Sequence, residues 1–163
     1  MPRRNRPPKR QIAPDVRYNS VLVSRFVNRM MRGGKKSVAT RVLYDAFDIM
    51  EARTKRDSLE TFEKAVQNAM PIIEVKPRRV GGSTYQIPVE VSGGRRLTLA
   101  IRWLLVSTKA RPGKSMAEKL AGELLDASQG VGATIKKKED THRMAEANRA
   151  LSLIHISEPT RRH

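Results

Sequence analysis

The stretch at residues 73–91, IEVKPRRVGGSTYQIPVEV, alternates apolar and polar residues in two short runs that flank a glycine pair. Alternation with a period of two predicts β-strands, and Gly81-Gly82 can supply the positive φ that a tight turn needs. The sequence therefore predicts one β-hairpin over residues 72–91, with Arg78 and Arg79 near its tip. We expect its base to be anchored on helices by the apolar positions of both runs: Ile73, Val75, Tyr85, Ile87 and Val89.

The chain on either side of the hairpin is predicted to be helical. Apolar residues recur at helical spacing in segments that glycine or proline breaks separate. Gly33-Gly34 ends the first segment, Pro71 ends the third, and Ser115 with Glu118 forms a capping box that opens the fifth. The predicted fold is mainly α: a six-helix bundle with a single β-hairpin that projects between the third and fourth helices.

The segment at residues 95–110, RRLTLAIRWLLVSTKA, is the most apolar of these helices. Its apolar residues cover most of a helical circumference, which is typical of a helix at the centre of a bundle. Trp103 is therefore predicted to be a core residue and not a platform on which bases stack. In the second helix, Val38 is placed on the buried face by its spacing from Val42 and Ala46.

The net charge points to a polyanionic partner. The chain of 163 residues carries 33 Lys and Arg against 16 Asp and Glu, a formal net charge of +17. Such an excess is usually matched by nucleic acid or by an anionic membrane. The charge is spread along the chain and no run is apolar enough to span a bilayer, so nucleic acid is the stronger interpretation and no membrane partner is expected.

The start of the chain, MPRRNRPPKRQ, is basic and rich in proline. It lacks the apolar core of a secretion signal, and its prolines disfavour a regular helix. We expect residues 1–18 to be a disordered basic arm that becomes ordered on a phosphate backbone. The absence of cysteine excludes disulfides and thiolate metal sites and fits a reducing, cytoplasmic location.

Two short motifs suggest phosphate binding but do not establish it. PGKS at residues 112–115 lacks the first glycine of a phosphate-binding loop, because Thr108 occupies that position. GGKK at residues 33–36 fails the same test, although a glycine turn with two lysines at a helix start can still attract an anion. The histidines show no metal-ligand spacing, and no catalytic constellation is visible, so we expect no enzyme activity, cofactor, metal or small-molecule substrate.

The basic residues recur in turns and at the starts of helices, where they could converge on one face. Aromatic residues make up only 4% of the chain, so recognition through a stacking sheet is poorly supported. Recognition of the shape and backbone of folded RNA fits better. An architectural DNA-binding protein is the alternative, although Val80 is the only candidate for an apolar wedge at the hairpin tip. An RNA-processing enzyme is a third possibility.

Motifs along most of the chain resemble the bacterial-type family of ribosomal protein S-seven of the small subunit. The resemblance covers about residues 1–149. It is carried by GKK at residues 34–36, the whole hairpin stretch, IRW at 101–103, KSMA at 114–117 and KKKEDTHRMAEAN at 136–148. The family's fold is six helices with one β-hairpin between the third and the fourth, in the order predicted above.

The resemblance implies a structural constituent of the small ribosomal subunit. Such a protein would bind the 3′ major domain of the rRNA, nucleate assembly of the head and lie near the tRNA exit site at the subunit interface. It would also contact exit-site tRNA and ribosomal protein S-eleven. The implied rRNA-binding residues are Arg3, Arg4, Lys9, Arg10, Lys35, Lys36, Lys76, Arg78, Arg79, Arg95, Arg96, Arg102, Arg111 and Lys114. The implied tRNA-side residues are Arg79, Gly81, Gly82 and Arg143.

The domain organisation expected from residues and resemblance together has three parts. Residues 1–18 form the arm, and residues 19–150 form the helical bundle with its hairpin. The tail at residues 151–163, LSLIHISEPTRRH, departs from the family pattern, and we interpret it as disordered or as foreign sequence joined in frame. The sequence leaves open whether the source is a bacterium or a plastid.

Overall fold

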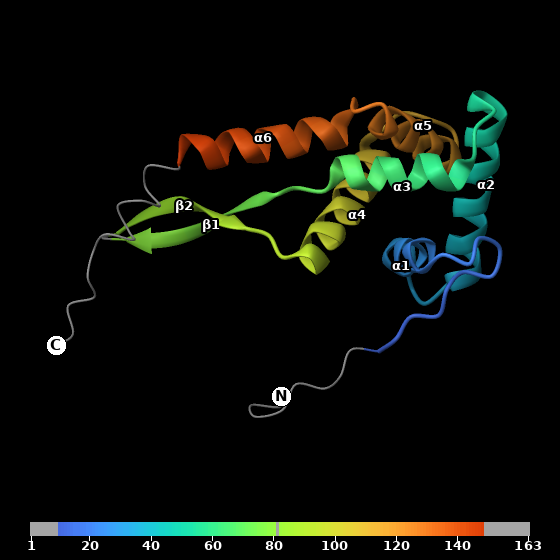
Figure 1. Cartoon of the computed structure of the whole chain (residues 1–163), viewed down its shortest axis with the longest axis horizontal. Coiled ribbons are helices and arrows are strands. Elements are labelled where there is room, and N and C mark those ends of the chain that lie inside the picture. The colour runs from blue at the N-terminus through green and yellow to red at the C-terminus, as the bar shows by residue number, and fades with distance from the viewer. Residues whose placement is uncertain (1–9, 81, 149–163) are drawn as a thin grey trace.

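The computed structural model describes residues 10–80 and 82–148. Within them lie six helices and one two-stranded antiparallel sheet (Figure 1). In chain order these are α1 (Val21–Met30), α2 (Lys36–Thr54), α3 (Ser58–Ala69), β1 (Ile73–Val80), β2 (Ser83–Glu90), α4 (Gly93–Ala110), α5 (Met116–Ser128) and α6 (Ala133–Ala147). The hairpin lies between α3 and α4, so the predicted fold is confirmed. No helix in this described part of the chain is long and apolar enough to cross a lipid bilayer.

Local sequence signals fix the ends of several helices. The Ser115 hydroxyl accepts a hydrogen bond from the Glu118 N–H at 3.2 Å, as the capping box at the start of α5 predicts. The Glu118 carboxylate in turn accepts from the Lys114 N–H at 3.3 Å. At the start of α3 the Asp57 carboxylate accepts from the Leu59 N–H. The bonds to the Glu118 and Leu59 N–H groups satisfy donors that a helix leaves without intrahelical partners.

The core of the helical body is built around aromatic rings. Phe26, Phe47 and Phe62 come from α1, α2 and α3 and are fully buried. The rings of Phe26 and Phe62 meet edge to face with centroids 5.3 Å apart, and Tyr18 packs edge-on to Phe47 at 5.1 Å. Edge-to-face pairs are favoured by the ring quadrupole. This cluster joins the first three helices and the segment that precedes them.

The most enclosed helix is α5, not α4. Only Glu118 of α5 is exposed, and Gly122 leaves room for the Arg111 side chain, which would lie 3.1 Å from a Cβ at this position. The prediction for α4 was wrong in part, because this helix buries one face and exposes Val106 to 60%. Trp103 is only partly buried and lies outside the main hydrophobic cluster. The Val38 prediction was also wrong, since its side chain is 50% exposed.

The hairpin register separates its two apolar sets. Cross-strand partners share a face of the sheet, and Ile73 and Val75 are paired with Glu90 and Pro88. Ile87 and Val89 are paired instead with Lys76 and Glu74, so they lie on the opposite face. The predicted anchor positions of the two strands therefore lie on opposite faces of the sheet, and α6 contacts both strands. The side chain of Tyr85 lies outside the described part.

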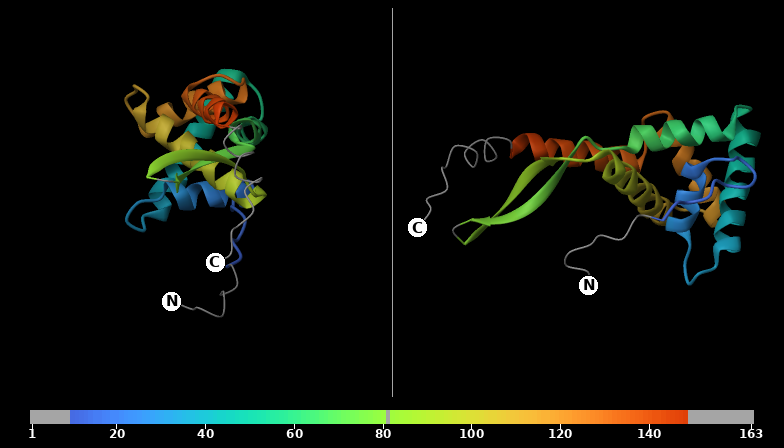
Figure 2. Two further views of the ribbon diagram at one scale, coloured as in Figure 1. Left: turned by 90° about the vertical axis from the view of Figure 1, so that its left-hand side faces the viewer. Right: turned by 60° about the horizontal axis from the view of Figure 1, so that its bottom comes forward.

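The hairpin leaves the helical body beside α6. Figure 2 shows the two strands extending past the ends of the other helices, with α6 running along their base. The Ile72 N–H donates to His142 Nε2 of α6 at 3.2 Å, and the Val91 N–H donates to the Ile72 carbonyl at 3.0 Å. The root of the hairpin is thus tied to α6, while its tip projects.

Candidate nucleic-acid interface

The predicted site residues that the structure describes fall into two regions. Lys35, Lys36, Arg111 and Lys114 lie in or beside the α1–α2 and α4–α5 turns, and the others lie on the hairpin, on the first part of α4 and, for Arg143, on α6. Arg10 is the first described residue and is exposed. Four predicted residues lie outside the described part of the chain: Arg3, Arg4, Lys9 and Gly81.

The two turns approach each other across the helical body. Arg32 and Lys35 of the α1–α2 turn border the same groove as Lys109 near the end of α4. All three side chains are exposed, and no ion pair links them or Lys36 to an acid within residues 10–80 and 82–148. Arg32 and Lys109 were not among the residues predicted from sequence. Both residues lie at helix ends beside predicted turns, and this position could have identified them as candidates from the sequence.

A line of bases on α4 connects these turns with the hairpin. Arg95, Arg102 and Lys109 are spaced by seven residues and all are exposed. In an α-helix a spacing of seven returns a side chain to nearly the same face. The three residues therefore form one line of positive charge, here called the α4 basic stripe. The repeat is visible in the sequence and could have identified Lys109.

The hairpin tip carries charge on both of its faces. Arg78 is paired with Tyr85 and Arg79 with Thr84, so adjacent arginines point to opposite sides of the ribbon. Residues 76–79 are all exposed. Gly82 has a φ of 88° in the connection after Val80, a conformation that favours glycine. Such a ribbon can contact phosphates on two sides at once.

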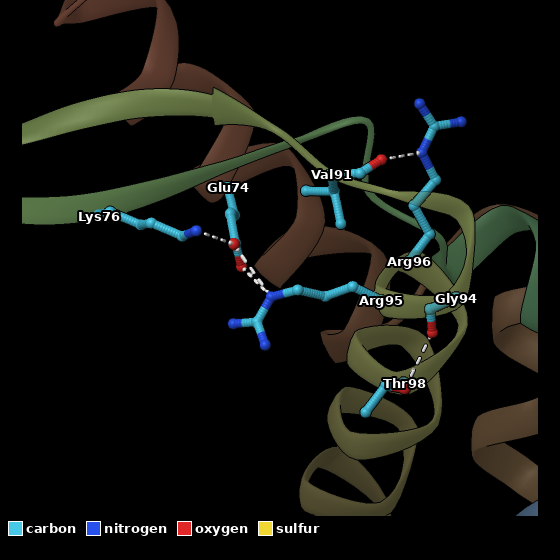
Figure 3. A network of polar contacts seen from close by, with 7 residues as sticks. All are labelled: Glu74, Lys76, Val91, Gly94, Arg95, Arg96 and Thr98. Atoms are coloured by element: carbon cyan, nitrogen blue, oxygen red, sulfur yellow. Dashed lines mark hydrogen bonds and ion pairs between the residues drawn. The ribbon is translucent and has the colours of Figure 1, made fainter. Parts of the chain in front are cut away.

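An ion-pair network fixes the hairpin root (Figure 3). The side chain of Glu74 is only 10% exposed, and its two oxygens accept from Arg95 Nε at 2.9 and 2.8 Å. Lys76 Nζ lies 3.4 Å from the same carboxylate. Burial alone would raise the pKa of Glu74, but the hydrogen bonds from Arg95 and Lys76 bring it below its ordinary value. Arg95 thereby joins β1 to the first turn of α4.

Arg96 has a related role on the neighbouring loop. Its Nε donates to the Val91 carbonyl at 3.0 Å (Figure 3). Val91 is buried and lies in the short connection between β2 and α4. The predicted bases at the start of α4 therefore hold the hairpin in its orientation, and Arg95 still exposes half of its side chain.

Arg111 is engaged by acids of the body. Its NH1 contacts the Glu123 carboxylate at 3.0 Å and its NH2 contacts Asp126 at 2.6 Å. The hydrogen bond from Arg111 to Asp126 is the main cause that raises the pKa of this guanidinium. Glu123 is buried and also accepts from the N–H and hydroxyl of Thr134 at the start of α6. The network connects α4, α5 and α6, and sequence spacing gave no sign of it.

The outer part of α6 presents Arg143 beside the hairpin. Its side chain is 77% exposed, with Asp140 3.9 Å away. Five residues earlier, Lys138 Nζ donates to the Asn68 carbonyl at 2.7 Å and so ties α6 to α3. Arg143 and the hairpin arginines are thus carried by two elements that run side by side at the root (Figure 2).

The exposed bases suit this surface to binding a polyanion. In the described ranges, no three His, Asp or Glu side chains are grouped so that they could hold a metal ion. The exposed bases are distributed over the two turns, the α4 basic stripe and the hairpin. Each phosphate that they neutralise would release condensed counterions and make binding dependent on salt.

Comparison with known proteins identifies the family. Residues 2–149 match the family model described as ribosomal protein S7p/S5e. Proteins named small ribosomal subunit protein uS7 are 64% identical in Desulfatibacillum aliphaticivorans, 60% in Roseiflexus sp. (strain RS-1) and 58% in Chloroflexus aurantiacus. Each alignment spans 152 residues, 93% of this chain and 97% of the relative.

The matched range contains every helix and strand of the described structure, including the hairpin, the α4 basic stripe and both basic turns. The fold, a basic helical body with one projecting ribbon, agrees with this match. Both agree with the resemblance predicted from the sequence. The chain therefore belongs to the ribosomal protein S7p/S5e family, in its bacterial type, and is a structural, rRNA-binding constituent of the small ribosomal subunit.

Proposed function

We propose that this protein binds the 3′ major domain of the small-subunit rRNA and nucleates assembly of the head. The observation that carries the proposal is the continuity of exposed bases from the α1–α2 turn through Lys109 and Arg102 to Arg95 at the hairpin root. A rigid helix that presents charge along one side can hold two RNA segments in a fixed relation. The role is structural, without catalysis, and family membership places it with cytoplasmic ribosomes.

The second element of the proposal concerns the hairpin. Its tip and α6 would face the tRNA exit site at the subunit interface, with Arg79, Gly82 and Arg143 on that side together with Gly81. Support comes from the projection of the ribbon beyond the helical body (Figure 1) and from the exposed arginines on both of its faces. Ribosomal protein S-eleven, on the platform of the subunit, would be a protein neighbour.

The remaining site residues form two groups: those whose side chains have no partner among the described residues and those that already donate hydrogen bonds to protein oxygens. Lys35, Lys36, Arg102 and Lys114 are exposed and have no ion pair in the described part of the chain, so they are the best candidates for direct phosphate binding. Arg95, Arg96 and Arg111 already donate to protein oxygens. Their contribution to RNA binding would include holding the hairpin and the helices in position.

The test is binding of the full chain to an isolated 3′ major-domain rRNA fragment and to duplex DNA of equal length, at physiological salt. We expect tighter binding to the RNA fragment. Equal affinity for both would overturn the proposal that the protein recognises this rRNA domain specifically.

The salt dependence of the RNA complex shows which bases neutralise phosphates. Lys35→Gln with Lys36→Gln should reduce the log–log salt slope by about 0.7 to 0.9 for each phosphate that is no longer neutralised. The matched control is Arg53→Gln with Arg56→Gln, which removes the same charge from the exposed far end of α2 and the residues just after it. An equal reduction of the salt slope in both double variants would mean that the RNA responds to net charge and not to a defined interface.

A further inference from the structure

An apolar groove opens where four helix ends meet beside the basic turns. It has a volume of about 330 Å³ and lies between the end of α1, the start of α2, the end of α4 and the start of α5. Its floor is formed by apolar side chains: Met30, Val38, Ala39, Val42, Leu105 and Met116. Its other lining residues are all basic: Arg32, Lys35 and Lys109.

The groove is a surface that the fold leaves uncovered. Val38 is 50% exposed although it lies one residue before the buried Ala39, and Met30, Val42 and Met116 are each only partly buried. An apolar surface rimmed by polar residues is typical of a binding site. Its volume is at the lower end of the range for ligand pockets.

The lining specifies the chemistry of the occupant. A ligand that fits must offer an apolar body to the floor and negative charge to the three cations of the rim. The thioethers of Met30 and Met116 make favourable contacts with aromatic rings and adapt to their shape. A nucleotide satisfies both demands, because its base has apolar faces and its phosphate is anionic.

We propose that this groove receives an unstacked base from a loop or bulge of the bound RNA, while Arg32, Lys35 and Lys109 bind the phosphates on either side of it. The inference rests on the proposed function and deepens it, because it names the RNA feature that the α1–α2 turn recognises. A regular duplex does not offer such a base, since its bases are stacked and paired.

Recognition in the groove would depend on shape more than on sequence. The floor side chains carry no hydrogen-bond donor or acceptor of ordinary strength, so they cannot distinguish the edges of the four bases. Every base has a π-face, and binding through that face is tolerant of sequence. The site therefore requires an unpaired nucleotide but not a particular one.

Methyl NMR on the full chain tests this directly. Protein with ¹³C-labelled methionine methyls is titrated with the 3′ major-domain rRNA fragment. A base in the groove should shift the Met30 and Met116 methyl resonances upfield through its ring current. Met50, which is fully buried, serves as the internal reference and should not shift in the same way.

A substitution in the floor supplies an independent measurement. Val38→Gln keeps the charge and a helix-forming residue but makes the floor polar, and it should weaken binding of the fragment about fivefold or more. The matched control is Val131→Gln in the α5–α6 turn, where valine is 53% exposed. That turn lies about 20 Å from Met116, at the other end of the 13-residue helix α5, and the control should bind like the unchanged protein.

The outcomes separate the two proposals. If the fragment binds but the two methyls do not shift and Val38→Gln binds normally, the nucleotide site is overturned while the proposed function stands. If the fragment does not bind at all, the proposed function fails and the nucleotide site fails with it. If a synthetic peptide of alternating Leu and Glu shifts both methyls and the RNA does not, the groove belongs to a protein partner and the proposal is overturned.

Discussion

The helical body and the hairpin of this protein hold their shapes in different ways. In the body, Phe26, Phe47 and Phe62 are fully buried, and Phe62 of α3 contacts both Phe26 of α1 and Phe47 of α2. In β1, by contrast, residues 76–79 are all exposed. An isolated two-stranded ribbon is marginally stable in water, so the hairpin depends on contacts at its root. The body can supply a rigid base, and the ribbon can devote its surface to charge.

The largest decrease in stability should follow from removing a core side chain of the helical body. Phe47→Ala removes a fully buried ring that packs on Tyr18 and Phe62 and should lower the free energy of unfolding by about 3 to 5 kcal/mol. Urea denaturation followed by circular dichroism measures it. A decrease of less than about 1 kcal/mol would mean that the aromatic cluster does not carry the stability of the body.

The next effect concerns the buried carboxylate of the body. Glu123→Gln removes the charge that Arg111 contacts and weakens the bonds from Thr134, with an expected decrease in stability of about 2 to 4 kcal/mol. Glu63→Gln, at an exposed position of α3, is the control and should change stability by less than about 0.5 kcal/mol. Equal effects would show that this network adds nothing beyond surface charge.

The hairpin root should respond locally. Glu74→Gln weakens the ion pairs with Arg95 and Lys76 and should cost about 1 kcal/mol. Hydrogen exchange of backbone amides in β1 and β2, and of Val91, should become about fivefold faster, while that of α2 and α5 stays unchanged. Uniform acceleration over the chain would contradict a separate root and show that hairpin and body open together.

A smaller effect should depend on pH through His142. Burial and the nearby charge of Lys138 lower the pKa of this imidazole, although Glu146 opposes them. The unfolded imidazole therefore takes up a proton first, near its ordinary pKa of 6.5, and part of the stability is lost as pH falls below that value. Protonation also removes the acceptor for the Ile72 N–H.

Unfolding measured between pH 7 and pH 5 in the unchanged protein and in His142→Gln isolates this contribution. The variant should show a flatter dependence of stability on pH over that range. The same slope in both proteins would mean that His142 does not link the hairpin root to pH.

The smallest effect on stability is expected at the hairpin tip. Arg78→Ala with Arg79→Ala removes exposed side chains and should change the free energy of unfolding by less than about 0.5 kcal/mol. Small subunits reconstituted with this variant should keep most rRNA binding but hold exit-site tRNA more weakly, and Arg53→Ala with Arg56→Ala is the matched control. Unfolding of the double variant, or complete loss of rRNA binding, would contradict the division between body and ribbon.

The secondary structure was readable from the sequence because its signals are local. Helical spacing, the Gly33-Gly34 break and the capping box at Ser115 each act within a few residues, and the structure confirms the elements that they predict. The failures arose where the three-dimensional environment decides. Val38 has helical apolar spacing but lies over a groove, and Trp103 lies on a helix that is buried on one face only.

The candidate interface was predictable in composition and only partly in arrangement. Bases at turns and helix starts were identified, and the repeat of seven on α4 could have added Lys109. The partners of Arg95 and Arg111 could not be identified, because Glu74 and Glu123 are 21 and 12 residues away in the chain. Whether a given base is available to RNA or engaged by protein depends on such distant contacts.

By itself, the sequence determined the order of helices and strands, the excess of positive charge and the motifs that mark the family, because each of these is written in neighbouring residues. The tertiary structure decided which faces of the hairpin carry which side chains, since that depends on the pairing register. It also decided that two basic turns meet beside one apolar groove. Side chains that are far apart in the chain acquire a common function only when packing brings them together.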